Sequence, residues 1–515
     1  MKDIELTMGG LCTERYGGVS RGHSTGGDPG RTESLNREQL LRYSNRAMKK
    51  TERDRSSPMQ LSLWEEGEQG QPVVRGEHVL FGPQRQVSQQ WKAACRRERA
   101  LTEDLMNRIA ELSNLAAAMR QVVSNGGSPG IDGMTVQELR DWFAGHAEDL
   151  RQDLLEGRYR PEPVKGVEIP KPGGGTRQLG IPTCRDRLVQ QAIARVLQSR
   201  YEATFSDHSY GFRPGRSAHQ ALSRASRYVA DGYTHVVDVD LEKFFDTVCQ
   251  DRLMRRLGYR IGDRRVLRLI GRFLRAGMMS EGLLSQRTKG TPQGSPLSPL
   301  LSNIVLDELD KELEARGHRF VRYADDLIIL TRSKVAAERV IRSISRYIER
   351  RMRLKVNRAK SRVCRPYRLN FLGYAIGYRG VLLLSRQSEA RFKAKLRRLT
   401  RRNRGISLEQ LVAELNPVLR GWLGYFRLAG MRTRLAKLEG WLRHRIRCFR
   451  LKQCKRAIGI VRFLRGLGVP TWRAWLLALS GKGWYRRAGT PPAHEGMNQK
   501  WFSSIGLYSM TSNYS

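Results

Sequence analysis

The stretch that decides the fold is FVRYADDLIIL, residues 320–330, in which two adjacent aspartates, Asp325 and Asp326, interrupt two apolar runs of β-type residues. A chain reversal at this point would place both acids at the tip of a hairpin. Neighbouring carboxylates repel each other and are costly beside buried strands unless a cation neutralises them, and Mg²⁺ prefers such hard oxygen ligands. Taken alone, the pair predicts either a magnesium site or a solvent-facing Asp-Asp turn.

A second apolar strand also carries acids: VVDVDLEKFFD, residues 236–246. Period-two alternation places Asp238 and Asp240 on one face of this strand and the intervening apolar residues on the other. If the strand packs beside the hairpin, it offers a third carboxylate to the same metals. Two Mg²⁺ ions would then activate a 3′-hydroxyl and neutralise a leaving pyrophosphate during in-line attack.

The overall charge points to a polyanionic partner. The chain has 515 residues, a formal net charge of +43 and a sequence pI near 10.8. Nucleic acid is the first candidate, and a solvated arginine-rich surface is the bland alternative. No apolar run approaches the roughly 18 residues that span a bilayer, so we expect no membrane partner.

The cysteines and the N-terminus indicate a reducing compartment. The seven cysteines include no CxxC pair and no cluster at zinc-ligand spacing, and the N-terminus lacks the apolar core of a secretory signal. We therefore expect reduced thiols and a cytoplasmic protein.

The texture of the sequence changes along the chain. Residues 1–95 are polar and Gly/Ser/Arg-rich, which predicts a flexible leader. Apolar residues from Leu105 to Val122 recur at helical spacing and predict one helix that ends at Gly126. Two extended runs around the Pro/Gly segment KPGGG, residues 171–175, predict a hairpin. Strands and helices alternate in the middle of the chain, and basic helices dominate beyond about Arg391.

At these motifs the sequence resembles the reverse transcriptases encoded by bacterial group II introns, the maturase type that copies its intron RNA and helps to splice it. Nine blocks follow the family's order over about four-fifths of the chain: an N-terminal helix with SPGIDG, IPKPGGGTRQLGIP, SYGFRPGRSAHQAL, VVDVDLEKFFDTV, GTPQGSPLSPLLSNIVLDELD, RYADD, LKVNRAKS, NFLGY and LNPVLRGWLGYF.

The resemblance implies an architecture. It is an α/β (α+β palm) right-hand polymerase, with fingers and palm over residues 96–385 and an all-α thumb, or maturase X, domain over residues 386–460. A basic tail, residues 461–515, follows. This tail has one histidine and no cysteine, so it departs from relatives that end in a His-Asn-His endonuclease with cysteine pairs.

The resemblance also implies roles for single residues. Asp240, Asp325 and Asp326 would be the catalytic ligands of two Mg²⁺ ions. Lys171 and Arg177 would grip the incoming triphosphate, where a point charge and a planar fork of donors suit the task. Their bland alternative is a pair of exposed hairpin cations.

Four further positions match the family's nucleotide-contacting residues. Phe245 would exclude a ribose 2′-hydroxyl by its bulk, although a plain core phenylalanine is the alternative. Gln293 and Gly294 would lie near the nucleotide and primer end, and Lys360 near the active site. Asp238 and Asp246 are acids in the same neighbourhood, for which we prefer a structural role.

The basic C-terminal helices interleave aromatic residues with cations. The aromatics alone favour helix packing over base stacking. The cations outnumber local acids so heavily that a phosphate-facing surface is the simpler interpretation. The expected RNA-binding residues are Arg420, Arg427, Arg443, Arg445 and Arg447.

The function predicted on this basis is RNA-directed DNA synthesis on group II intron RNA, with binding of that RNA to assist splicing and mobility. The partners would be intron RNA, a DNA primer or target, an RNA template and deoxynucleotides, and the oligomeric state is left open. A non-catalytic splicing maturase is one alternative, against which the intact acidic motifs argue. A reverse transcriptase of a retron, diversity-generating or phage-defence system is the other.

Overall fold

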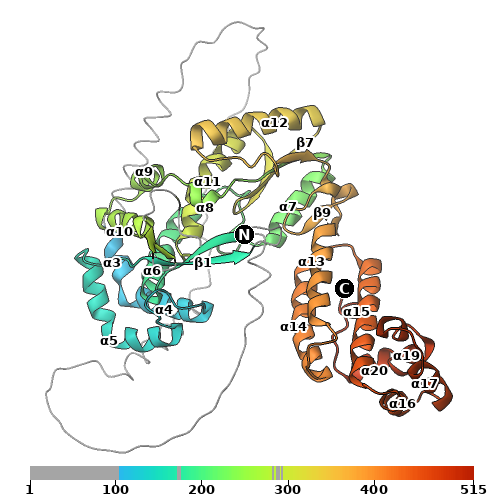
Figure 1. Cartoon of the computed structure of the whole chain (residues 1–515). Coiled ribbons are helices and arrows are strands. Elements are labelled where there is room, and N and C mark those ends of the chain that lie inside the picture. Colours follow the sequence, from blue (N-terminus) through green and yellow to red (C-terminus); the bar gives the residue numbers. More distant parts are fainter. Residues whose placement is uncertain (1–103, 171–175, 281–282, 286–289, 291–293, 515) are drawn as a thin grey trace, which may run out of the picture.

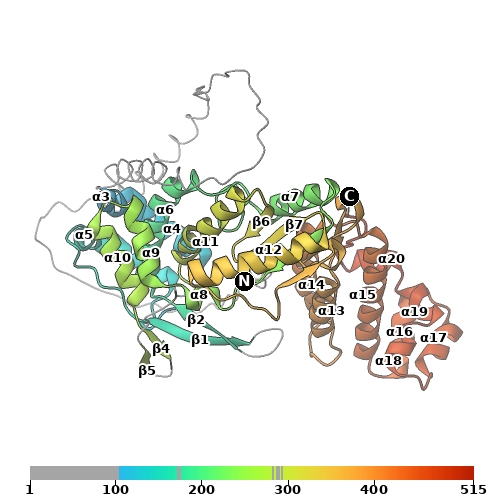
Figure 2. The same cartoon turned by 90° about the horizontal axis from the view of Figure 1, so that it is seen from above.

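The computed structural model describes residues 104–514 except 171–175, 281–282, 286–289 and 291–293. The predicted leader and the candidate residues Lys171 and Gln293 therefore lie outside the described residues. Three parts follow one another in space (Figure 1): an N-terminal helical block, a central sheet and a C-terminal helical arm. The central sheet separates the other two parts in both cartoon views (Figures 1 and 2).

The N-terminal block packs helices around a small sheet. Its helices are α3 (Leu105–Ala110), α4 (Leu112–Asn125), α5 (Val136–Leu155), α6 (Cys184–Glu202), α9 (Gln250–Arg260) and α10 (Arg264–Arg275). The capping box of α5 shows how locally its start is specified, because the Thr135 side chain accepts from the Glu138 backbone while the Glu138 carboxylate accepts from Thr135 N.

The single helix expected from Leu105 to Val122 is wrong in one respect, because the structure has two helices. Glu111 lies between α3 and α4 with ψ 130°, outside the helical region. The Asn114 side chain donates to the carbonyl of Ile109 at 3.0 Å, so a side chain contacts a carbonyl near the break. The expected end at Gly126 is confirmed, with φ +64° at that glycine.

The small sheet contains the expected hairpin. Strands β1 (Val164–Pro170) and β2 (Thr176–Ile181) pair antiparallel, and the register sets Pro170 opposite Thr176 on either side of the Pro/Gly segment. β1 also pairs in parallel with β4 (Met278–Ser280), which pairs antiparallel with β5 (Leu283–Ser285).

The central sheet has the order β6-β7-β3-β8, and all its pairs are antiparallel. Its strands are β3 (His235–Val239), β6 (Arg319–Tyr323), β7 (Asp326–Thr331) and β8 (Arg362–Cys364). We call these four strands the palm sheet. Both faces are buried, because Val237, Val239 and Ile329 belong to one apolar core and Val236 and Ile328 to another.

Different helices cover the two faces of the palm sheet. α11 (Ser298–Ala315) and α12 (Lys334–Tyr347) share the first core, and α12 continues into a short π-helix, Ile348–Met352. α7 (Ala218–Ala230) shares the second core, together with the C-terminal arm. In the view from above α12 runs along the palm strands (Figure 2).

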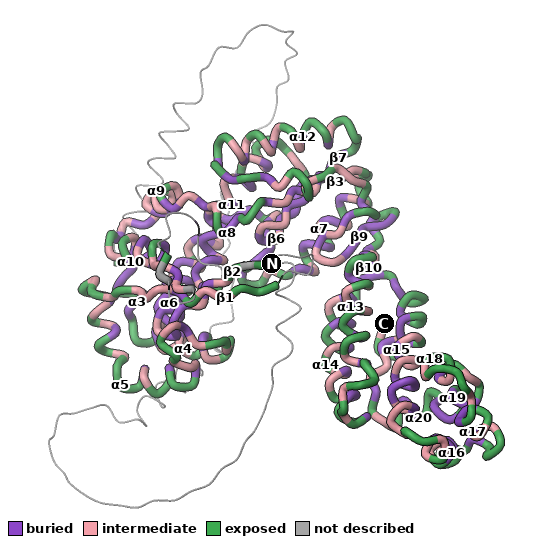
Figure 3. Tube along the Cα trace, viewed as in Figure 1, coloured by how far each residue is buried: buried purple, intermediate pink, exposed green. Residues whose placement is uncertain are grey.

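The C-terminal arm begins after the hairpin of β9 (Tyr374–Ile376) and β10 (Leu382–Leu384), and the described residues beyond it contain no strand, as expected. Its helices are α13 (Arg386–Leu399), α14 (Leu408–Phe426), α15 (Arg432–Gln453), α16 (Ala457–Gly466), α17 (Thr471–Ala478), α18 (Trp484–Arg487), α19 (Pro491–Gly496) and α20 (Gln499–Ser504). Buried residues lie on the inward sides of these helices (Figure 3).

Residues 461–514, expected as a basic tail, are folded. α16 spans the boundary expected at residue 460, and Trp501, Phe502 and Met510 lie in the same apolar core as Ile446 of α15. None of the described helices combines the length and apolarity that a membrane crossing requires.

Candidate active site

The register of the palm sheet brings the three predicted aspartates to one end of neighbouring strands. Tyr323 pairs with Asp326 across the tip of the β6-β7 hairpin, so Ala324 and Asp325 form its two-residue turn. β3 pairs with β7 so that Val239 lies opposite Leu327. The next residue, Asp240, therefore follows the end of β3 where Asp326 begins β7.

Alternation along the strands also places two of these acids on one face. Val236 and Ile328 face the core that the palm sheet shares with the C-terminal arm. Asp240 and Asp326 are an even number of residues away from them, so both carboxylates project from that same face. All three aspartates are partly exposed, which leaves them accessible to a ligand.

The loop NRAKS, residues 357–361, holds the backbone of Asp240. Asn357 N donates to the Asp240 carbonyl at 2.8 Å, and Asp240 N donates to Ser361 Oγ at 3.0 Å. The Lys360 ammonium lies 3.7 Å from the Asp240 carboxylate. The same loop thus fixes the position of the aspartate and sets a cation beside it.

A buried ion pair stabilises the turn of the β6-β7 hairpin. Arg322, in β6, is 1% exposed and forms a two-point contact with Asp310 of α11: Nε to Oδ1 at 2.7 Å and Nη2 to Oδ2 at 2.5 Å. Its third nitrogen, Nη1, donates to the Ala324 carbonyl at 2.9 Å and to Asn303 Oδ1 at 3.0 Å. Arg322 therefore ties the residue before Asp325 to α11.

The segment SYGFRPG packs against the same turn. Asn303 Nδ2 donates to the Gly211 carbonyl at 2.9 Å. A Cβ on Gly211 would lie 2.2 Å from Ala324 N, so only glycine allows this approach. Sequence reasoning missed Arg322, Asp310 and Asn303; the available signal was a cation inside an otherwise apolar strand.

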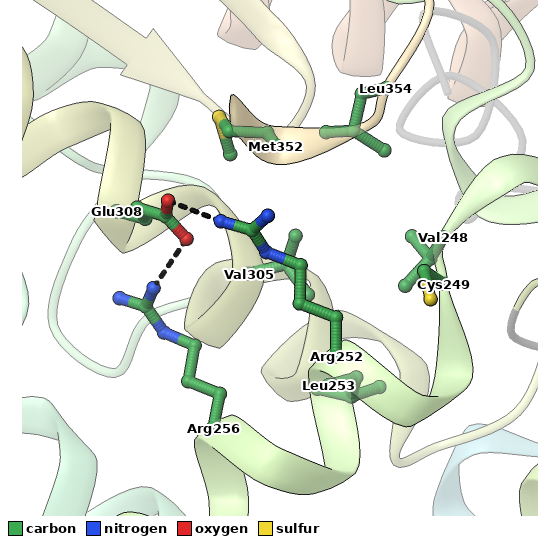
Figure 4. Close-up of a pocket in the computed structure, with 9 residues that line it drawn as sticks. All are labelled: Val248, Cys249, Arg252, Leu253, Arg256, Val305, Glu308, Met352 and Leu354. Atoms are coloured by element: carbon green, nitrogen blue, oxygen red, sulfur yellow. Dashed lines mark hydrogen bonds and ion pairs between the residues drawn. The ribbon is translucent and has the colours of Figure 1, made fainter. Parts of the chain in front are cut away.

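Helix α11 carries Asp310 and Asn303, and two ion pairs to helix α9 hold α11 in place. Figure 4 shows Arg252 and Arg256 of α9 reaching the two oxygens of Glu308, at 2.5 and 2.9 Å. The cavity beside them holds only about 10 Å³. That volume suits at most one water, so this place is packing and not a ligand site.

Phe245 lies in the short helix α8 (Phe244–Thr247), a few residues beyond Asp240. Its side chain is 8% exposed, belongs to the same core as Leu297 of α11's N-cap, and meets Phe244 edge to face at 5.3 Å. Lys243, before the helix, has φ +45°. Phe245 is therefore core-packed near the aspartates, and its contact with a sugar stays a prediction.

Gly294, the last residue of the PQG motif, lies beside β2 near the base of the β1-β2 hairpin. Gly294 has φ +116°, and a Cβ there would lie 2.8 Å from the carbonyl oxygen of Gly180 in β2. Upstream, a Cβ on Gly290 would lie 2.6 Å from the carbonyl oxygen of Phe245. Gly294 therefore lies against the hairpin, and Gly290 lies against α8. Arg177 lies in β2 opposite Ile169, and its side chain is outside the described structure.

The three aspartates are of the ligand type that a magnesium ion prefers. Three carboxylates at strand ends supply hard oxygen ligands. In the described residues, no group of three or more His, Cys, Asp or Glu side chains lies close enough together to hold a metal ion. The three aspartates are neighbours at one end of the sheet, but their side chains do not form such a group. Asp238 faces Arg362, with the two charged groups 3.8 Å apart.

The five candidate RNA-binding arginines fall into two groups. Arg420 and Arg427 are exposed on or after α14. The other three have partners inside the arm: Arg443 pairs with Glu439 and donates to Gln499 Oε1, Arg445 Nε donates to Thr400 Oγ1 at 2.6 Å, and Arg447 Nε donates to the Met497 carbonyl at 2.9 Å.

Arg447 is only 7% exposed, and burial lowers the pKa of its guanidinium to about 10. These three arginines connect α15 to the α13–α14 segment and to the folded tail. Their contact with RNA stays a prediction, and the structure gives each of them a structural role as well.

A palm sheet with acids at a hairpin tip, flanked by a helical block with a β-hairpin and by a helical arm, is the arrangement of a template-directed polymerase. Family comparisons agree: residues 169–376 match the family described as "Reverse transcriptase (RNA-dependent DNA polymerase)", and residues 390–464 match "Group II intron, maturase-specific domain". The expected fold class is confirmed.

Curated relatives narrow the class. The chain is 33% identical over 348 residues to protein YkfC of Escherichia coli (strain K12). This alignment covers 60% of this chain and 91% of YkfC. It is 38% identical over 195 residues to the group II intron-encoded protein LtrA of Lactococcus lactis subsp. cremoris, covering 37% of this chain and 32% of LtrA.

One solved structure, titled "Partial Cas6-RT-Cas1--Cas2 complex", aligns with 48% of this chain and 42% of its own at 27% identity and a TM-score of 0.32. From the family matches and the relatives, the chain belongs to the reverse transcriptase/maturase family encoded by group II introns. It is an RNA-directed DNA polymerase, and its family depends on divalent metal ions.

Proposed function

We propose that this chain copies group II intron RNA into DNA, with Asp240, Asp325 and Asp326 as the ligands of two Mg²⁺ ions. The observation that carries the proposal is the register of β3 on β7, which makes Asp240 the neighbour of Asp326 beside the turn at Asp325. When bound, the ions would supply the charge that activates a 3′-hydroxyl and stabilises a leaving pyrophosphate.

The chain's own residues would position the nucleotide. Lys171 follows β1 in the sequence and Arg177 lies in β2, and two such cations would hold a triphosphate. Gln293 and Gly294 would contact the nucleotide and primer end, and Gly294 lies against Gly180 of β2. Lys360 would offset the charge of Asp240 before the metal ions bind, because its ammonium lies 3.7 Å from that carboxylate.

Sugar selection is assigned to Phe245. Its helix starts soon after Asp240, and its ring is held by the surrounding core. A fixed aromatic wall at the 2′ position would admit a deoxyribose and clash with a ribose hydroxyl.

The C-terminal arm would bind the intron RNA to assist splicing and mobility. Support comes from the match to a maturase-specific domain and from the net charge of +43. Arg420 and Arg427 are the best placed of the candidate cations because they are exposed. We place the protein in the cytoplasm, which agrees with the five free cysteines of the described residues.

The test is primer extension by Asp325→Asn on a primed RNA template, with Asp246→Asn as the matched control. Asp325→Asn should abolish Mg²⁺-dependent extension and leave RNA binding intact, because it removes a ligand charge and no surface cation. Asp246 is an exposed acid of α8, so the control should extend normally. Near-wild-type extension by Asp325→Asn would remove the catalytic assignment.

A further inference from the structure

A cavity of about 490 Å³ opens in the C-terminal arm between the connection that follows α13, the outer turns of α15 and the start of α18. Among the described residues, no acidic side chain lines it. Six of its lining residues are cationic or aromatic: Arg401, Arg402, Arg445, Lys452, Trp484 and Tyr485.

Hydrogen bonds fix the walls of this cavity. The Arg445 guanidinium donates from Nε to Thr400 Oγ1 at 2.6 Å and from Nη2 to the carbonyls of Arg397 and Thr400, at 3.2 and 3.3 Å. Cys448 Sγ lies 3.5 Å from the Trp484 carbonyl oxygen. The connection after α13 and the start of α18 are therefore both attached to α15, so the cavity is a built part of the arm.

Three of the cations lack an acidic partner among the described residues. Neighbouring arginines have acidic partners, such as Arg404 with Glu414 at 2.7 Å and Arg443 with Glu439. Arg401, Arg402 and Lys452 form no ion pair within the part of the chain that the structure describes. Like charges gathered around one cavity repel each other, so an anion bound there would be stabilised.

The aromatic residues add a second kind of contact. Tyr485 is 53% exposed, and its ring is fixed from one side by His444, at 4.2 Å between ring centroids in an edge-on arrangement. A free phosphate would occupy a small part of 490 Å³ and leave this ring unused. A ligand with both a phosphate and a planar base would use the cations and the aromatic ring together, and the volume lies in the range of small-molecule sites, about 300–1,000 Å³.

We propose that this cavity binds one nucleotide of a single-stranded nucleic acid, with the base stacked on Tyr485 and the adjoining phosphates held by Arg402 and Lys452. Unpaired bases are the usual targets of aromatic platforms beside cations, because a base within a duplex has no free face. The proposal deepens the proposed function, since it names where the arm would hold an unpaired segment. The strand is intron RNA or the DNA being copied or invaded, and the test separates these sources.

The experiment measures binding of fluorescent U12 and dT12 to the full chain over a range of salt concentrations. Arg402→Gln/Lys452→Gln removes two unpaired cations of the cavity, and Tyr485→Leu removes the stacking ring. The matched control is Arg339→Gln/Arg346→Gln, which removes two exposed cations from α12 of the palm. All variants are first checked for an unchanged melting temperature.

The two cavity variants should differ in their signatures. The cation variant should weaken binding about tenfold and flatten the slope of log Kd against log salt by about 1.4, at roughly 0.7 per phosphate contact of a single strand. Tyr485→Leu should weaken binding by at least about fivefold with an unchanged slope, because stacking displaces no counterions. The control should change both quantities by less than half as much as the cation variant.

The tighter of the two probes identifies the source, RNA if U12 and DNA if dT12. A 5-iodouridine-substituted probe should cross-link to the peptide that contains Tyr485. The proposal is overturned if Tyr485→Leu binds U12 and dT12 normally and inorganic polyphosphate displaces these probes equally well from the wild type and from this variant. That result would show a site for anions in general, with no role for the base. The proposal is equally overturned if the α12 control matches the cation variant. Extension of an annealed primer tests the proposed function separately. A chain that binds U12 normally but does not extend the primer would contradict the proposed function and leave the cavity proposal standing.

Discussion

The buried pair of Arg322 and Asp310 should control both stability and catalysis, and the two effects can be separated. Arg322→Lys keeps the positive charge and loses the planar fork that contacts Asp310 at two points and the Ala324 carbonyl at a third. Both side chains are at most 1% exposed. Asp310 would therefore keep a buried charge with poorer compensation.

The magnitude follows from this burial. Breaking a buried ion pair by removing one partner costs about 3–5 kcal/mol, and a lysine that recovers part of the contact should cost about 2–3 kcal/mol. Against a typical total of about 5–15 kcal/mol the variant stays folded. Loss of the bond to Ala324 releases the turn before Asp325, and a misplacement of about 1 Å costs about 100-fold in rate.

Two measurements decide the matter: urea denaturation, and single-turnover primer extension at a temperature where the variant is folded. Arg252→Lys is the control, because its partly exposed pair with Glu308 also fixes α11 but does not reach the turn. It should cost at most about 1 kcal/mol and leave extension normal.

Replacing both partners, Arg322→Met with Asp310→Leu, should restore much of the stability because no buried charge remains. Extension should stay slow, because neither new side chain can donate to Ala324. If this double variant recovers extension together with stability, Arg322 acts only on folding and its role in positioning the turn is refuted. Wild-type extension by a fully folded Arg322→Lys variant would refute it as well.

Three other outcomes are expected. Phe245→Ala should raise the ratio of ribonucleotide to deoxynucleotide incorporation, because space opens beside the sugar; an unchanged ratio in competitive primer extension would make the ring a core residue only. Burial raises the pKa of the Asp186 carboxyl to about 6, although the hydrogen bonds that this carboxyl accepts from Tyr159 Oη and from the backbone amide of Glu162 act to lower it. The folded state then holds this proton more tightly than the unfolded state, so the wild type loses stability as the pH rises from about 4 to 6. Asp186→Asn does not ionise, so its unfolding free energy should rise relative to that of the wild type by up to about 3 kcal/mol between pH 4 and pH 7. A difference in unfolding free energy that does not change with pH would contradict this. Arg420→Gln with Arg427→Gln should weaken binding of intron RNA several-fold and flatten its salt slope by up to about two units, with no change in melting temperature; normal RNA binding would exclude these exposed cations from the interface.

Local patterns were enough to predict the separate elements. Strand β3 follows from the alternation of acids and apolar residues, and the β6-β7 hairpin follows from two apolar runs that an acidic pair interrupts. The β1-β2 hairpin follows from its Pro/Gly turn. These features depend on neighbours along the chain, so their periods are visible in the sequence. The ordered motifs likewise sufficed for the family and the fold class.

The partners of these elements were decided only in three dimensions. No local signal states that β3 pairs with β7 in the register that sets Asp240 beside Asp326, because that choice depends on how two apolar cores fill both faces of the sheet. The break at Glu111 is another case, since the apolar spacing runs through it.

The basic residues also show what the sequence determines and what only the tertiary structure decides. The sequence determined that the C-terminal arm is strongly basic, and so predicted a polyanionic partner. It could not determine that Arg322 and Arg447 point inward while Arg402 and Lys452 line a cavity. A guanidinium has the same formal charge in both settings, and only the tertiary structure decides whether a carboxylate, a carbonyl or solvent meets it.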